Sequence, residues 1–249
     1  ADLSDVREGR PPDIADAEIV RFLEGLPQRY LQLFSREAIY SHVRLARDIP
    51  PDRVHATLEQ NGNAWELTVA TLDKPYLFSN ICGVLASFGM NILRGHAFTN
   101  PNGLVLDVFE FTDDERFLAL NPDAHAQVLH VLQEVVSGRS DVAELLRGRE
   151  QSVVQWRGNA RVAPVVRADR EASEHFTILD IVAGNALGLL YRISRVISRH
   201  GCDVDLVLIS TEGERAIDVF HITKAGVKLT EAEQLALTSD LQGTLEATL

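Results

Sequence analysis

The sequence predicts an α+β protein made of two copies of one small unit, each with an antiparallel sheet and two helices, preceded by a short helical segment. Two observations carry this prediction. The first is a long internal repeat, in which the same order of apolar and turn residues appears twice. The second is periodicity, because in each copy apolar stretches of strand length are followed by apolar residues at helical spacing.

The repeat centres on a turn between an apolar strand and an apolar helix. After the helix, Gly89 or Gly201 supplies the backbone conformation with which a chain commonly leaves a helix. The third strand of each copy contains the same Asp-Val-Phe triplet, beginning at Asp107 and at Asp218. The turn reads Asp73-Lys74-Pro75-Tyr76-Leu77 in the first copy and Asn185-Ala186-Leu187-Gly188-Leu189 in the second.

The first fifty residues belong to neither copy. Residues 1–13 are polar and lack periodicity, which predicts a disordered or loosely bound start. Helical spacing begins at Ile14, and Pro27 ends that helix. A second helix is expected with Ser35 as its N-cap. We therefore expect a helical N-terminal segment over residues 1–50.

Each copy also carries a leading strand, at residues 54–60 and at residues 161–167. The unit therefore reads strand, strand, helix, strand, strand, helix. This order predicts a ferredoxin-like layer, an antiparallel sheet with both helices on one face. A lone unit with two open edges would be marginally stable, so pairing of the two units, or dimerisation, is expected.

The last helix of each unit is expected over residues 123–137 and 230–249. A further short helix is expected at residues 140–146, and a linker at residues 151–159. These expectations give the domain boundaries: the helical segment, then one unit at 51–150 and a second at 160–249.

Composition excludes several classes of function. The formal charge of -12 repels phosphate backbones, so nucleic-acid binding is not expected. No apolar run approaches the ~18 residues that a membrane span needs, and no signal peptide is visible, so we expect a cytoplasmic protein. Cys82 and Cys202 fit buried apolar positions, and neither a metal nor a cofactor is expected. Because the chain begins at Ala1 without an initiator Met, we expect a fragment of something larger.

Each repeat resembles an ACT domain, a small βαββαβ module that binds amino acids and regulates metabolic enzymes. Its pattern is an apolar strand, Asp-Arg-Pro-Gly-Leu-Leu, a helix ending in Gly, and Asn-Ile opening the second strand. The first copy fits this pattern but has Tyr76 in place of the glycine, whereas the second keeps Gly188 and loses the Asp, Arg and Pro. The closing strand of the pattern is not visible in either copy, and the leading strand is a candidate for its place.

With the stretch Leu26-Pro27-Gln28-Arg29-Tyr30 ahead of it, the tandem is similar to the C-terminal part of the bifunctional uridylyltransferase/uridylyl-removing enzyme family. The chain contains no Gly-Ser followed by Asp-x-Asp and no His-Asp dipeptide, so the family's catalytic motifs are missing. The resemblance implies a regulatory module that senses glutamine. It also implies as partners a catalytic domain or a PII-type signalling protein, and a homodimer is possible.

The turn offers groups suited to a free amino acid. Backbone N–H groups at a helix start bind a carboxylate, Asp73 can accept from an ammonium, and Asn91 can bond a side-chain amide such as that of glutamine. Three alternatives stay open: Asp73 caps the helix, Tyr76 fills the pocket, or both sites are degenerate and the tandem is a protein-interaction module. The candidate ligand-binding residues are Asp73, Lys74, Pro75, Tyr76, Leu77, Asn91, Ile92, Asn185, Leu187, Gly188, Leu189, Asp203 and Val204.

Overall fold

The structure, a computed structural model, describes residues 1–152 and 162–247. Most of the predicted linker therefore lies outside the described residues. The helices are α1 (Leu3–Glu8), α2 (Asp16–Leu23), α3 (Gln28–Leu33), α4 (Arg36–Leu45), α5 (Leu77–Ser87), α6 (Phe117–Leu120), α7 (Ala124–Val136), α8 (Val142–Ser152), α9 (Leu189–Arg199) and α10 (Glu231–Glu246). The strands are β1 (His55–Asn61), β2 (Ala64–Leu72), β3 (Asn91–Thr99), β4 (Leu104–Thr112), β5 (Val165–Asp169), β6 (Thr177–Gly184), β7 (Cys202–Glu212) and β8 (Arg215–Lys224).

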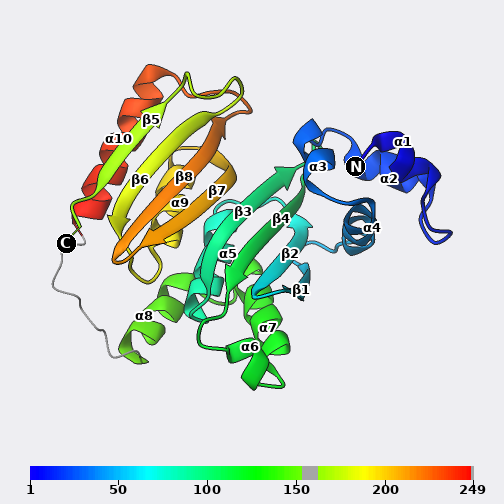
Figure 1. Ribbon diagram of the computed structural model, residues 1–249, viewed down its shortest axis with the longest axis horizontal. Coiled ribbons are helices and arrows are strands. Elements are labelled where there is room, and N and C mark those ends of the chain that lie inside the picture. The colour runs from blue at the N-terminus through cyan, green and yellow to red at the C-terminus, as the bar shows by residue number, and fades with distance from the viewer. Residues whose placement is uncertain (153–161, 248–249) are drawn as a thin grey trace.

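The strands form one antiparallel sheet in the order β1-β2-β4-β3-β7-β8-β6-β5, visible across Figure 1. The α+β class and the element order within each unit are confirmed. The leading strands β1 and β5 lie at the two ends of the sheet, each paired with the strand that follows it. Each takes the edge position that a closing strand would otherwise fill.

The two units are joined through their β3 and β7 strands. Three residue pairs make the joint: Arg94 with Leu208, Gly95 with Val207, and His96 with Leu206. At Gly95 a side chain would meet Phe109 and Val207 at 3.0 and 3.1 Å, so glycine permits this close approach. Pairing within one chain therefore protects an edge of each unit. Because both units share one sheet, the division at 51–150 and 160–249 stays a prediction.

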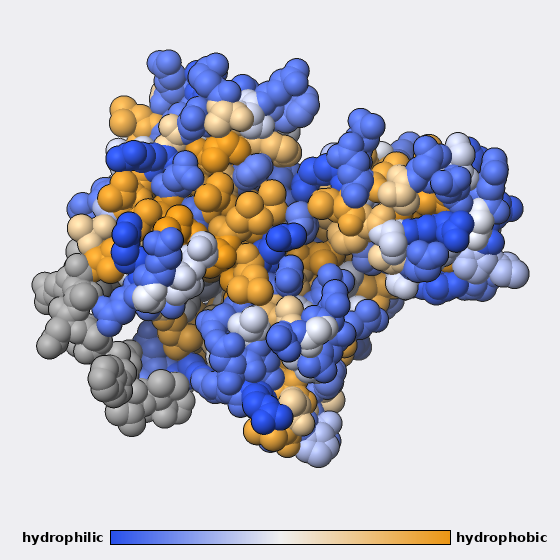
Figure 2. Space-filling view, viewed as in Figure 1, coloured by the Kyte–Doolittle hydropathy of each residue, from blue (hydrophilic) through white to orange (hydrophobic). Residues whose placement is uncertain are grey.

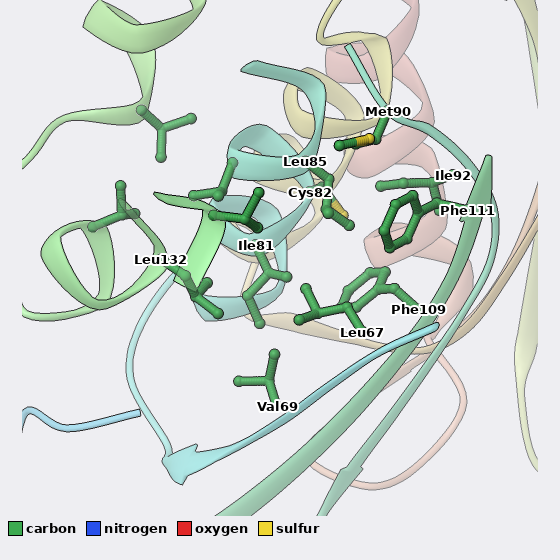
Figure 3. Close-up of a cluster of buried hydrophobic side chains, with 14 of the residues drawn as sticks. Leu67, Val69, Ile81, Cys82, Leu85, Met90, Ile92, Phe109, Phe111 and Leu132 are labelled. Carbon is green, nitrogen blue, oxygen red and sulfur yellow. The ribbon is translucent and has the colours of Figure 1, made fainter. Parts of the chain in front are cut away.

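The core of the first unit lies between the sheet and α5. Figure 3 shows Ile81, Cys82 and Leu85 of α5 pointing toward Leu67 and Phe109 of the sheet. These side chains are buried, and each of the leucine, isoleucine and phenylalanine side chains contributes roughly 1.5–3 kcal/mol by leaving water. The second unit repeats the arrangement, with α9 and α10 packed over β6 to β8.

The N-terminal helices cover the opposite face of the first unit. Tyr30 of α3 is buried there against Phe98 of β3, and its hydroxyl is 2.7 Å from His42 Nδ1. The expectation of a disordered start was wrong, because α1 packs on α4. Val6 is fully buried, and the Tyr40 hydroxyl donates to the Val6 carbonyl at 2.8 Å. These contacts come from distant residues, which local periodicity does not report.

No such helices cover the corresponding face of the second unit within the described residues. Figure 2 shows apolar side chains gathered at the surface over β6 to β8, and Leu208 of β7 is 38% exposed. None of the helices in the described part of the chain is both long and apolar enough to cross a membrane.

Candidate functional site

A cavity of about 610 Å³ lies where α3 meets the two units. Its wall combines the strand–helix turn at residues 73–77 with the end of β3 and the first residues of β7. The end of β3 contributes residues 97–99, and β7 contributes residues 202–205. Because β3 and β7 are neighbours in the sheet, the cavity lies at the joint between the units.

Tyr76 takes the backbone conformation that the repeat requires. Its φ and ψ are 62° and 15°, close to the 74° and 11° of Gly188, its counterpart in the second unit. A side chain in this left-handed region costs roughly 1–2 kcal/mol. The Tyr76 ring lies 5.5 Å from the guanidinium carbon of Arg195 on α9, within the range of a cation–π contact. The ring therefore contacts the second unit and lines the cavity.

Asp73 does not cap α5, which has no side-chain cap. Its backbone N–H donates to the Gly103 carbonyl at 2.8 Å and so fixes the turn against the β3–β4 hairpin. The carboxylate is exposed and lines the cavity. The capping alternative is therefore wrong for this turn. The first N–H groups of α5 lack partners within the helix, as at any helix start.

Lys74 lines the cavity, but its ammonium is already occupied. It donates to the Asp52 carboxylate and lies 3.3 Å from the Val136 carbonyl. The ion pair with Lys74 lowers the pKa of Asp52. Lys74 therefore ties the turn to the first unit and contributes no free charge to the cavity.

Arg29 of α3 connects the three parts of the molecule. Its Nη2 donates to the carbonyls of Ala97 on β3 and Asp205 on β7, at 3.0 and 3.2 Å. Its guanidinium carbon lies 4.4 Å from the centre of the Phe98 ring. The buried Nε has no hydrogen-bond partner in the described residues. Arg29 thus presents an unused donor beside the joint between the units.

Three carboxyl groups of the cavity wall have raised pKa values. Burial raises the pKa of Asp107 well above its usual range, and the nearby Asp73 carboxylate raises it further. The same two causes raise the pKa of Asp203. Burial also raises the pKa of Asp205 to about 6, although Arg29 and the Thr223 hydroxyl oppose that shift. The cavity wall therefore gathers three carboxyl groups whose buried surroundings favour the neutral, protonated form over the carboxylate.

The turn of the second unit faces a different environment. A side chain at Gly188 would meet Leu146 of α8 at 3.2 Å, so α8 covers the place that corresponds to the cavity. Leu187 packs against the first core, and the exposed Asn91 donates to Asp114 instead of facing a cavity. The predicted residues that do not line the cavity are Asn91, Ile92, Asn185, Leu187, Gly188 and Leu189; those that line it are Asp73, Lys74, Pro75, Tyr76, Leu77, Asp203 and Val204.

Sequence reasoning did not select Arg29, Asp107 or Asp205. Asp107 lies on the interior strand β4, is 1% exposed, and its Oδ1 has no partner in the described residues. Its recurrence as Asp218 was a visible signal, but only the fold shows that Asp107 reaches a cavity.

Comparison with known proteins identifies relatives along most of the chain. The chain is 30% identical over 237 residues to the bifunctional uridylyltransferase/uridylyl-removing enzyme of Gluconobacter oxydans (strain 621H), covering 92% of this chain and 25% of that enzyme. It is also 30% identical over 231 residues to that of Azospirillum brasilense, covering 90% and 25%. The chain therefore spans about a quarter of the length of the curated relatives it matches.

No protein-family model matches the chain. A solved structure of an unknown protein from Galdieria sulphuraria aligns over 74% of this chain and 90% of its own, with 9% identity and a TM-score of 0.23. On its sequence relatives, the chain is homologous to a part of the bifunctional uridylyltransferase/uridylyl-removing enzymes, and its described residues form the same unit twice.

Proposed function

We propose that the chain is a non-catalytic regulatory module that binds a free amino acid in the cavity between its two units. One observation carries the proposal: the same wall holds an unused donor, Arg29 Nε, and an unpaired carboxyl oxygen, Asp107 Oδ1. A zwitterion supplies one partner for each. Unsatisfied buried polar atoms are costly, so a site that carries two of them gains free energy when a ligand pairs them.

The two ends of an amino acid find complementary groups in this wall. The α-carboxylate can accept from the first N–H groups of α5, where the helix dipole favours negative charge, and from Arg29. The α-ammonium can donate to Asp73 and Asp107, and the Asp73 carboxylate lies close enough to Asp107 to raise its pKa. The volume of about 610 Å³ is within the range of small-molecule sites.

Regulation follows from where the ligand sits. It would touch α3, the turn of the first unit and β7 of the second, which meet at the joint between β3 and β7. A ligand that binds one arrangement of these parts more tightly shifts the equilibrium toward it by that difference in affinity. A partner would respond to this shift in arrangement, and the candidates are an attached catalytic domain, a PII-type protein or a second copy of the chain. The homology to the uridylyltransferases favours glutamine as the ligand.

The test is thermal stability with a panel of free amino acids at millimolar concentration. A ligand at about 100 times its Kd stabilises the folded state by roughly 2.7 kcal/mol, or about 5–10 °C for a chain of this size. Asp73→Ala should abolish the shift. Asn185→Ala changes the corresponding turn residue of the second unit, which does not line the cavity, and should preserve it. A shift that survives Asp73→Ala and is lost in Asn185→Ala would place the ligand elsewhere.

A second candidate function is a degenerate tandem that acts through protein contacts. The packing of Leu146 against Gly188 favours it, because one of the two turn sites is already filled by α8. Flat melting curves across the whole panel would support this alternative. Uridylylation of a PII-type protein by this chain alone would contradict both candidates.

A further inference from the structure

The sheet of the second unit has an apolar face that no other part of the described chain covers as a layer. Side chains along a strand alternate between the two faces of a sheet. In β5 to β8 one set packs toward α9 and α10, so the alternate set lies on the opposite face, where Figure 2 shows apolar side chains gathered. We call this the outer face. Its apolar residues are Val165, Ile178, Val182, Leu206, Leu208, Ile217 and Val219.

The strand register brings these side chains into one continuous patch. Val219 of β8 lies opposite Leu208 of β7. Val182 of β6 lies opposite Ile217 on one side and Val165 on the other. Side chains directly opposite each other on neighbouring strands are in contact distance. Val165 and Leu208 are 40% and 38% exposed. A contiguous exposed apolar patch of this kind marks an interaction surface.

The first unit shows how the same positions are buried when a layer covers them. Leu106 and Val108 flank the aspartate of the Asp-Val-Phe triplet in β4, as Ile217 and Val219 do in β8. Leu106 and Val108 belong to the core under the N-terminal helices and are 2% and 4% exposed. Ile217 and Val219 are only half-buried. The outer face of the second unit therefore has the composition of a covered sheet face without its cover.

The charges around the outer face favour a second copy of the chain as that cover. The whole chain has a formal charge of -12. Outside the cavity wall, however, the strand residues of this face and the adjoining part of β3 contribute three basic and three acidic side chains, all exposed: Arg94, Arg167, Arg215, Asp169, Asp180 and Glu212. In a two-fold symmetric dimer the same surface meets itself. A balanced face can do so without net repulsion, whereas a face as acidic as the rest of the chain could not.

We propose that the outer face is the interface of a homodimer, in which it packs on the same face of a second copy as the two layers of a β-sandwich. An apolar centre with a charged rim of both signs is the usual composition of a protein interface. The dimer buries in the second unit the positions that the N-terminal helices bury in the first. This interface is separate from the ligand site, because none of its seven apolar residues lines the cavity.

The experiment is sedimentation velocity of the full chain over a series of micromolar concentrations. The unchanged chain, 27.6 kDa as a monomer, should shift to a dimer as its concentration rises. Leu208→Glu and Val165→Glu each place a carboxylate in the apolar patch and should raise the Kd of the dimer at least about tenfold. Leu235→Glu is the matched control. Leu235 is 69% exposed on α10, on the other side of the sheet, and its replacement should leave the Kd unchanged.

Three results would overturn the proposal. The chain could stay monomeric at every concentration, which would leave the outer face to a different occupant, such as an amphipathic helix of a partner protein. A dimer could persist in both carboxylate variants, or Leu235→Glu alone could disrupt it, and in either case the interface would lie elsewhere. Circular dichroism of each variant separates lost association from lost folding. The measurement is made without an amino acid, so its outcome is independent of the proposed ligand site.

Discussion

Replacing Asp218 by Asn should remove a pH-dependent loss of stability. Asp218 lies on β8, is 2% exposed, and its Oδ1 has no hydrogen-bond partner in the described residues. Burial raises the pKa of this carboxyl from 3.8 to about 7. The folded protein therefore holds the proton more tightly than the unfolded chain does, and the neutral carboxylic acid is the form compatible with this position.

Proton linkage sets the sign and the size of this pH-dependent change in the free energy of unfolding. The stabilisation by the bound proton is fully present below pH 3.8 and is lost as the pH rises through about 7. A difference of about three powers of ten in proton affinity corresponds to roughly 4 kcal/mol, lost at about 1.4 kcal/mol per pH unit. Asn is nearly isosteric with the neutral acid and has no such loss. The stability of Asp218→Asn should therefore rise relative to the unchanged protein between pH 4 and 7, and level off above.

Urea unfolding followed by circular dichroism at pH 5, 6, 7 and 8 measures this difference. Between pH 5 and pH 7 we expect the gap between the two proteins to widen by roughly 2 kcal/mol. Asp180→Asn, at an exposed position on the neighbouring strand β6, is the matched control and should show no such slope. A gap that is the same at pH 5 and pH 8 would refute the reasoning, because the Asp218 carboxyl would then not carry the proton.

Two further predictions concern stability. Leu146→Ala should lower the free energy of unfolding in urea by about 2–4 kcal/mol and open space beside Gly188. Leu145→Ala, at the half-buried neighbouring position, should lower it less. Equal losses would mean that α8 does not seal the second turn through Leu146. Thr230→Ala should lower the free energy of unfolding by about 1 kcal/mol, because it removes a capping box with Glu233 at the start of α10. Thr230→Ser should retain most of that stability. An unchanged melting temperature in Thr230→Ala would contradict the role of the cap.

Much of the fold was predictable because the same order of apolar and turn residues occurs twice in the sequence. Ser35 and Thr230 cap helices as their residue types suggest, and the leading strands pair where the hairpin pattern places them. The start of the chain was not predictable in the same way. Val6 orders α1 through a contact with Tyr40, and such a distant contact leaves no periodic trace in the sequence.

The candidate site was also predictable only in part. Residues 73–77 could be selected because a strand–helix turn exposes N–H groups whatever surrounds it. Arg29 and Asp107 could not, because each reaches the cavity only after α3, β4 and β7 are assembled. Nor could the sequence show that the two turns differ in exposure, since both have the same local pattern.

The sequence by itself determined the two units, their order of elements and the positions of their turns, because those follow from local propensity and repetition. Only the tertiary structure decided which turn stays open. α8 packs Leu146 over Gly188, while the joint between β3 and β7 brings Asp203 beside Asp73. Such an asymmetry depends on distances between segments far apart in the chain, and periodicity carries no information about those distances.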